Sequence, residues 1–131
     1  MHTPGRIADA YFHPVAVVAT AERRFGWQLR SRTRNALAWS VRTRSSLRGA
    51  EADIQALRRA LANAGAWQFT AVEEDSEWWW TAALDGVDVA RAAVGAWNRV
   101  TALKKAADFV TTGAGARMSR VLLVAAGASL R

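Results

Sequence analysis

Hydrophobic and polar residues alternate most clearly along residues 67–73 and 78–84, which flank the dipeptide Asp75-Ser76. Alternation with a period of two predicts half-buried β-strands, and the short polar link predicts a hairpin. In a register with a two-residue loop, Trp79 lies on one face of this hairpin. The other face then carries seven apolar side chains: Trp67, Phe69, Ala71, Trp78, Trp80, Ala82 and Leu84. We therefore expect that face to turn toward the core.

A second pair of alternating stretches, residues 27–34 and 38–44, predicts another hairpin. A loop of three residues would pair Thr33 with Trp39 and give one apolar and one basic face. A loop of two residues would mix both kinds of side chain on each face, so the longer loop is preferred. The basic face of the preferred hairpin is an arginine ladder: Arg30, Arg32, Arg34, Arg42 and Arg44.

The arginine ladder would set Arg30 directly across from Arg42. Like charges directly opposite each other destabilise a sheet by up to about 1 kcal/mol, and bound carboxylates or phosphates would offset that cost. Rows of guanidinium groups suit such anions. The equal alternative is a solvated outer face that protects an edge strand from aggregation.

Helical periodicity appears in residues 50–64 and, in two pieces, in residues 7–25. In the N-terminal stretch, Pro14 is tolerated in a first helical turn and His13 can cap it. In the later stretch the apolar side chains recur at helical spacing, which predicts a helix with one buried stripe: Ile54, Leu57, Leu61 and Ala64.

Residues 87–110 predict a long helix, because apolar residues recur there in steps of three and four. Asp85 or Asp88 can cap its start. A loop at 111–116 would lead to a buried final strand within 117–126, for which a short helix is the alternative.

The expected element order is α-β-β-α-β-β-α-β, and its last six elements match the ferredoxin-like split unit. We therefore expect an α+β fold with a β-α-β-β-α-β sheet and helices on one face, preceded by an N-terminal helix and an added strand. The length of 131 residues fits one domain, with a helical segment at 1–26 and an α+β core at 27–131. Beyond the two-fold echo in this order, we find no internal sequence repeat.

Charge is distributed unevenly along the chain, whose formal net charge is +7. Eight of the 18 basic residues fall between Arg23 and Arg48 without an intervening acid, and no basic residue lies between Arg59 and Arg91. The latter stretch holds the acidic cluster Glu73, Glu74, Asp75 and Glu77. If the two stretches lie on different sides, copies can join head to tail and close a ring. Neutralisation within one molecule is the alternative.

Seven tryptophans are many for a chain of this length, and the run Trp78-Trp79-Trp80 is unusual. An alternating strand must send Trp79 to the face opposite its two neighbours. That side chain either fills a covered second face of the sheet or anchors an interface, since tryptophan is enriched at binding hot spots.

The sequence excludes some kinds of chemistry and lacks the residue patterns that others require. The chain has no cysteine, which excludes disulfides and thiolate chemistry. His2 and His13 lack a partner constellation, so we expect no catalytic residues, no metal site and no cofactor. No apolar run approaches the ~18 residues of a membrane span. The N-terminus lacks the apolar core of a signal peptide, so we expect a cytoplasmic or virion location.

The order of hairpin, helix and hairpin across residues 27–84, with the helical stretch SLRGAEADIQALRRAL at 46–61, resembles phage neck and tail-completion proteins of the tail-terminator class. That resemblance implies a small α+β subunit that closes into a ring at the end of a tail tube. Our first hypothesis is thus a non-enzymatic structural subunit, in which the arginine ladder meets the acidic cluster of a neighbouring copy.

Two alternatives stay open. A nucleic-acid-binding module would use the same arginine face on phosphates. A ferredoxin-like small-molecule binder or enzyme would use a pocket lined with tryptophan.

Overall fold

The computed structural model describes residues 10–18, 23–33, 35–62 and 67–125, and these form a mixed α+β fold. The elements are, in chain order, β1 (Tyr11–Val18), β2 (Arg23–Arg30), β3 (Ala36–Ser40), α1 (Leu47–Ala62), β4 (Trp67–Glu74), β5 (Glu77–Leu84), β6 (Val87–Ala92), α2 (Arg99–Ala114), β7 (Arg117–Met118) and β8 (Leu122–Ala125). The strands form one sheet in the order β4-β5-β6-β3-β2-β1, and both β7 and β8 pair with β1. The α+β class predicted from the sequence is confirmed.

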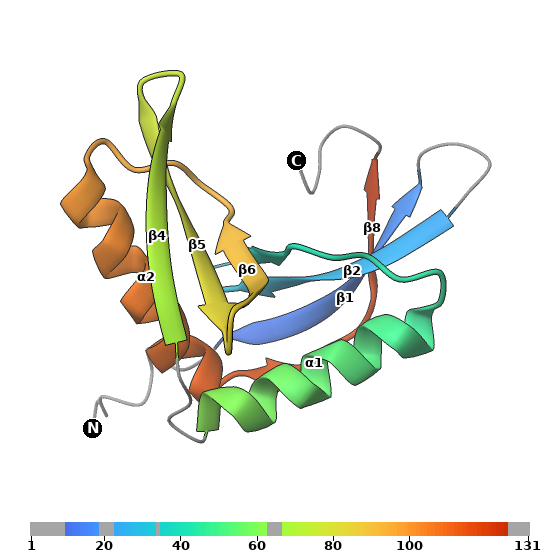
Figure 1. The fold of residues 1–131 in the computed structure, drawn as a ribbon. Helices are drawn as coiled ribbons and strands as arrows, with labels where there is room; N and C mark the ends of the chain where they lie inside the picture. The colour runs from blue at the N-terminus through green and yellow to red at the C-terminus, as the bar shows by residue number, and fades with distance from the viewer. Residues whose placement is uncertain (1–9, 19–22, 34, 63–66, 126–131) are drawn as a thin grey trace.

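The fold consists of two equivalent units, each made of three antiparallel strands followed by a helix. The first unit is β1-β2-β3-α1 and the second is β4-β5-β6-α2. They join where β3 pairs with β6 in antiparallel fashion at the centre of the sheet. Figure 1 shows the β4-β5-β6 half rising steeply from the other half, with α2 along the first and α1 along the second.

The two units also enter their helices in the same way. Before α1, the backbone of Arg44 pairs with Phe25, and before α2 the backbone of Ala96 pairs with Trp78. Ser46 then accepts a hydrogen bond from the amide of Gly49 at 3.1 Å. Asn98 plays this role for α2 and accepts from the Thr101 amide at 2.7 Å. The repeat therefore exists in the geometry, although different residues at equivalent positions hide it in the sequence.

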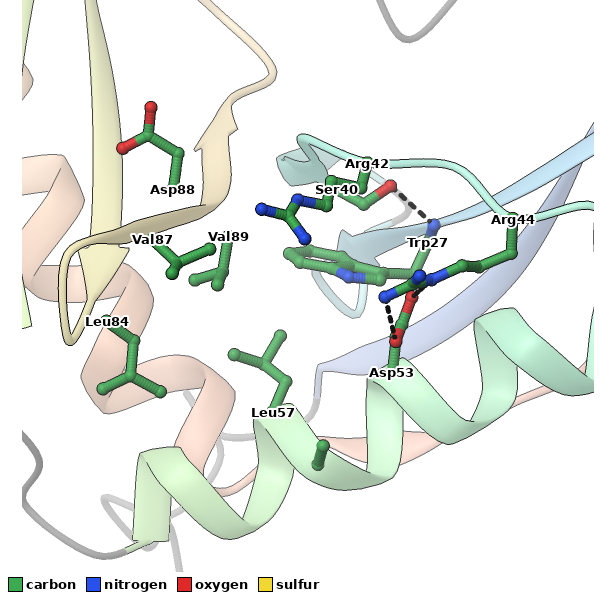
Figure 2. A pocket seen from close by; sticks show the side chains of 11 residues that line it. Trp27, Ser40, Arg42, Arg44, Asp53, Leu57, Leu84, Val87, Asp88 and Val89 are labelled. Atoms are coloured by element: carbon green, nitrogen blue, oxygen red, sulfur yellow. Dashed lines mark hydrogen bonds and ion pairs between the residues drawn. The ribbon is translucent and has the colours of Figure 1, made fainter.

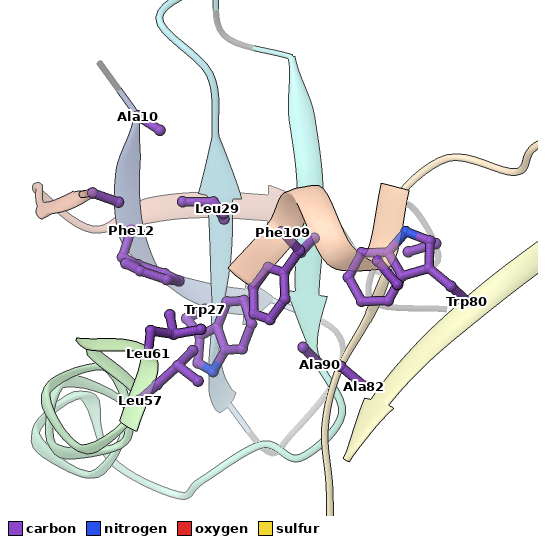
Figure 3. Close-up of a cluster of buried hydrophobic side chains, with 14 of the residues drawn as sticks. Ala10, Phe12, Trp27, Leu29, Leu57, Leu61, Trp80, Ala82, Ala90 and Phe109 are labelled. Atoms are coloured by element: carbon purple, nitrogen blue, oxygen red, sulfur yellow. The ribbon is translucent and has the colours of Figure 1, made fainter. Parts of the chain in front are cut away.

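Both helices cover one face of the sheet, around a core that draws on both units (Figure 3). Phe109 of α2 lies at its centre: its ring stacks on Trp27 of β2 at 6.3 Å between centroids and meets Trp80 of β5 at 5.4 Å. Trp67 adds an edge contact at 6.1 Å. The apolar stripe predicted for the first helix is buried at Ile54, Leu57 and Leu61, while Ala64 lies outside the described residues.

The ferredoxin-like strand order is not what the sheet adopts. That order would place the strand before α1 directly beside β5, whereas β6 lies between β5 and β3. The reason is that residues 87–92, expected to begin a long helix, form a strand. Asp85 and Gly86 have positive φ values of 51° and 81°, which make a tight hairpin turn between β5 and β6.

Helix α2 consequently starts at Arg99, and Asn98 caps it in place of the expected Asp85 or Asp88. It also continues to Ala114, through most of the stretch predicted as a loop at 111–116. Strand structure follows in β7 and β8, so the prediction of a strand within 117–126 is confirmed over its described residues.

The helix expected at 7–25 is wrong wherever the structure describes that stretch. β1 and β2 pair along their full lengths, and β1 also pairs in parallel with β7 and β8. Pro14, which has no amide hydrogen, falls between the part of β1 that pairs with β7 and the part that pairs with β8. Because Pro14 lies in that gap, its missing amide hydrogen removes no ladder hydrogen bond between β1 and either β7 or β8. The rest of the predicted helix, residues 7–9 and 19–22, lies outside the described residues.

The hairpin of β4 and β5 has the predicted register. Glu74 pairs with Glu77 across a turn in which Asp75 and Ser76 have φ values of 53° and 68°. Trp79 lies across from Val72, and its half-buried side chain packs against the core cluster.

For the hairpin of β2 and β3, the predicted register is wrong. Trp39 pairs with Gln28 rather than with Thr33, and Arg30 pairs with Ala36 rather than with Arg42. Apolar burial explains the difference. In β2, which begins at Arg23, Trp27 and Leu29 are buried. Leu29 pairs with the equally buried Ala38 on the core face, and this contact favours the observed register.

We expect that replacing Phe109 by alanine removes about 3–5 kcal/mol of unfolding free energy, because a large buried ring at the centre of the core leaves a cavity. Urea denaturation followed by tryptophan fluorescence measures the loss. Val100→Ala is the matched control on the same helix, since Val100 is 76% exposed and should change stability by less than about 0.5 kcal/mol. Equal effects of the two variants would contradict the placement of Phe109.

Candidate functional site: two charged surfaces and a cavity between the repeats

The structure divides the predicted arginine ladder. Arg30 ends β2, where its Nε donates a hydrogen bond to the side-chain oxygen of Gln28. Arg32 is exposed in the turn that follows, and Arg34 lies outside the described residues. Arg42 and Arg44 follow β3 on the way to α1. The five arginines therefore do not form one face of a hairpin.

Arg44 fastens the segment between β3 and α1 to the helix. Its Nε and a terminal nitrogen donate to the two carboxylate oxygens of Asp53 at 2.7 and 3.1 Å. This hydrogen bonding, and then the negative charge of Asp53, raise the pKa of Arg44 above its ordinary value. Arg24 binds the same segment, through the hydroxyl of Thr43 at 3.1 Å and its carbonyl at 2.9 Å. Both arginines hold local structure together.

Three exposed arginines around this segment form what we call the arginine surface: Arg23, Arg42 and Arg48. They gather because Phe25, two residues after Arg23, pairs with Arg44, and because Gly49 lies against the side chain of Arg44. Within the described part of the chain, none of the three has an ion pair. Their charges are available to an anion.

The acidic cluster lies at the tip of the β4–β5 hairpin, which projects from the molecule away from α1 (Figure 1). All four of its side chains are exposed: Glu73, Glu74, Asp75 and Glu77. Of these, Glu73, Asp75 and Glu77 form no ion pair with the residues that the structure describes. The acidic cluster therefore lies apart from the segment between β3 and α1 that carries the arginine surface.

Sequence reasoning selected Trp79 as an anchor, but the exposed tryptophan is Trp97. Trp79 is half-buried and its indole nitrogen is enclosed. Trp97 is 80% exposed, beside the exposed Val94 and Val100. Backbone hydrogen bonds of 2.7 and 2.8 Å between Trp78 and Ala96 place Trp97 near the start of β5, close to the acidic tip.

A cavity of about 180 Å³ lies where α1 of the first repeat faces the β5–β6 turn of the second (Figure 2). Its apolar lining consists of Trp27, Ala56, Leu57, Leu84, Val87 and Val89. Arg42 and the Arg44–Asp53 pair border it on the side of β3. Asp88 borders it too, but its carboxylate points away from the apolar side chains in Figure 2.

A second cavity, of about 750 Å³, occupies the equivalent place in the other repeat. It lies between α2 and the β2–β3 turn, and it is lined by Trp80 and Phe109 where the first has Trp27 and Leu57. Both cavities therefore arise from the way the helix of one unit meets the hairpin turn of the other.

Among the residues that the structure describes, no group of three or more histidine, aspartate or glutamate side chains could hold a metal ion. None of their helices is long and apolar enough to cross a membrane.

We expect Asp53→Asn to lower the unfolding free energy by about 0.2–1 kcal/mol, because the ion pair with Arg44 is partly solvated. The loss should shrink as salt is added, since salt screens the pair. Chemical denaturation at two salt concentrations tests this, with Asp108→Asn as the control at an exposed carboxylate without an ion pair among the described residues. A loss that is independent of salt would contradict the electrostatic origin.

Comparison with known proteins gives the fold and no activity. No protein-family profile and no curated protein matches the chain. One solved structure, the solution NMR structure of a UPF0339 protein from Shewanella oneidensis, is similar to it with a TM-score of 0.61. The likeness covers 91% of this chain and 94% of that protein, at 7% sequence identity. The chain therefore shares the overall fold of a UPF0339 protein.

Proposed function

We propose that the chain is a non-enzymatic assembly subunit, which joins further copies of itself through its acidic hairpin tip and its arginine surface. The observation that carries the proposal is the separation of two clusters of opposite charge on one folded chain. Glu73 and Glu77 at the tip, and Arg23 and Arg48 at the arginine surface, have no ion pair within the described residues. A contact between unlike surfaces of two copies satisfies both clusters at once.

Trp97 supplies the apolar part of such a contact. Gly95 packs so closely on Glu77 that an added Cβ would lie 2.9 Å from the glutamate side chain, which keeps this loop beside the tip. Trp97 follows in the same loop and exposes 80% of its surface. A tryptophan beside carboxylates is well suited to a basic partner, because its ring also attracts guanidinium groups.

A contact between two different surfaces is heterologous, so it repeats from copy to copy and yields a closed ring or an open filament. A ring is the form that the resemblance to tail-terminator proteins implies. We therefore propose the neck or tail of a phage as the first setting in which to look for this subunit.

The charge-swap experiment tests this proposal. Glu73→Lys with Glu77→Lys, or Arg23→Glu with Arg48→Glu, should each reduce the native mass to that of a monomer, because every head-to-tail contact then opposes like charges. An equimolar mixture of the two double variants should recover the large mass, since each complements the other. Size-exclusion chromatography with light scattering at low salt measures both outcomes.

Two single variants sharpen the result. Trp97→Ala should weaken the assembly without unfolding the protein, because its side chain is largely solvated. Asp108→Lys changes charge on α2 away from the tip and should leave the mass unchanged. A wild-type protein that stays monomeric at low salt and high concentration overturns the proposal.

A second candidate, binding of nucleic acid, has one specific observation in its favour. Arg23, Arg42 and Arg48 are exposed and uncompensated among the described residues of a chain whose net charge is +7.

If three phosphates are contacted, the logarithm of DNA affinity should fall with the logarithm of salt with a slope of about −3, and Arg48→Gln should make it about one unit shallower. Fluorescence anisotropy with labelled DNA and RNA measures this slope. Trp97→Ala separates the two candidates, since it should leave nucleic-acid affinity intact. Absence of retention on both nucleic acids at low salt would exclude this function.

A further inference from the structure

The cavity between α1 and the β5–β6 turn has an apolar floor and a cationic rim. Trp27, Leu57 and Leu84 come from three different elements and converge on it (Figure 2). Trp27 and Leu57 also belong to the buried core, so the floor is built from fixed side chains. A rigid apolar floor favours ligand parts that leave water without requiring the protein to rearrange.

The size of the cavity limits the apolar part of a ligand. Its volume is about 180 Å³. An engineered cavity of about 150 Å³ lined by apolar side chains in another protein binds benzene. The space here therefore accepts about one aromatic ring or a short branched alkyl group.

The rim carries one uncompensated positive charge. Arg44 is paired with Asp53 at 2.7 Å, so that guanidinium is already neutralised. Arg42 has no such partner among the described residues. Asp88 also borders the cavity, but its carboxylate points away from Val87 and Val89 in Figure 2. The electrostatic preference of the rim is thus set by Arg42.

We propose that this cavity binds a small amphipathic carboxylate, with a single ring or short branched alkyl body against Trp27 and Leu57 and its carboxylate on Arg42. An arginine fork holds a carboxylate through two parallel hydrogen bonds. The apolar body then fills the space between α1 and the β5–β6 turn. Such a ligand bridges the two repeats, and it does so whether or not the protein assembles into larger complexes.

The equivalent cavity of the other repeat supports the assignment by contrast. The caps Ser46 and Asn98 align the two repeats. Val94 then occupies the position equivalent to Arg42, and Lys105 on α2 occupies the position equivalent to Asp53. The second cavity is also wider, at about 750 Å³. The two repeats therefore share the position of a cavity while only the first combines ring-sized space with an arginine at its rim.

Three probes with the same carbon skeleton test the proposal: 3-phenylpropionate, 3-phenylpropylamine and 3-phenylpropanol. Isothermal titration calorimetry of the 131-residue chain should show the carboxylate binding about tenfold more tightly than the amine or the alcohol. Arg42→Gln should abolish that preference by weakening the carboxylate about tenfold, as expected for the loss of one charge-assisted contact. Arg99→Gln is the matched control, because it removes the same charge at an exposed position outside the cavity lining and should leave the affinity unchanged.

A second pair of variants tests the site itself. Ala56 is exposed and lines the cavity from α1, so Ala56→Trp should block binding while the protein stays folded. Ala52→Trp adds the same ring to the same helix at an exposed position outside the lining and should bind normally. Equal affinities for the three probes, no binding of any of them at millimolar concentration, or full binding to Ala56→Trp would each overturn the proposal.

Discussion

The stack of Phe109 on Trp27 is the contact on which the arrangement of the two repeats depends. Phe109 belongs to the helix of the second repeat and Trp27 to a strand of the first, and their rings lie nearly parallel at 6°. Phe12 meets the Trp27 ring edge-on and Trp80 lies against Phe109, so the aromatic side chains run continuously through both units. Because each such pair adds about 0.5–1.5 kcal/mol beyond burial of area, this cluster fixes α2 against strands of both repeats.

The two-fold arrangement explains why the functional features come in related but unequal pairs. Each repeat places a hairpin turn near the helix of the other, which creates a cavity on either side. The strand pairs β1–β2 and β4–β5 also correspond. β1 is covered by β7 and β8, whereas β4 forms an edge of the sheet in the described part of the chain. The acidic tip therefore belongs to the more open of the two equivalent hairpins.

The sequence predicted those elements whose patterns are local and unmixed. Ile54, Leu57 and Leu61 repeat at helical spacing, and the alternation around Asp75-Ser76 is strict, so α1 and the β4–β5 register followed from the residues alone. The prediction failed where tertiary pairing decides the structure. Proline is common both at the start of a helix and in a gap of a strand ladder. Only the pairing of β1 with β7 and β8 shows that Pro14 lies in such a gap.

Two misplaced features show which signals were outweighed. The dipeptide Asp85-Gly86 is a strong hairpin signal, but the apolar periodicity that follows it favoured a helix through residues 87–92. The arginine ladder failed because alternation fixes faces and not register. Burial of Leu29 against Ala38 determines the register of β2 and β3, and no charge on the opposite face can compete with it.

The contacts of the arginines show why a count of charges along the sequence does not locate a binding site. Arg24, Arg30 and Arg44 form hydrogen bonds with Thr43, Gln28 and Asp53, so three of the eight arginines in the basic stretch stabilise the fold. What distinguishes Arg42 is its geometry, because it borders an apolar cavity while its neighbour Arg44 is held by the helix. Removing Asp53 would release a second cation at this rim. The selectivity of the cavity for one negative charge thus rests on the same ion pair that secures the entry into α1.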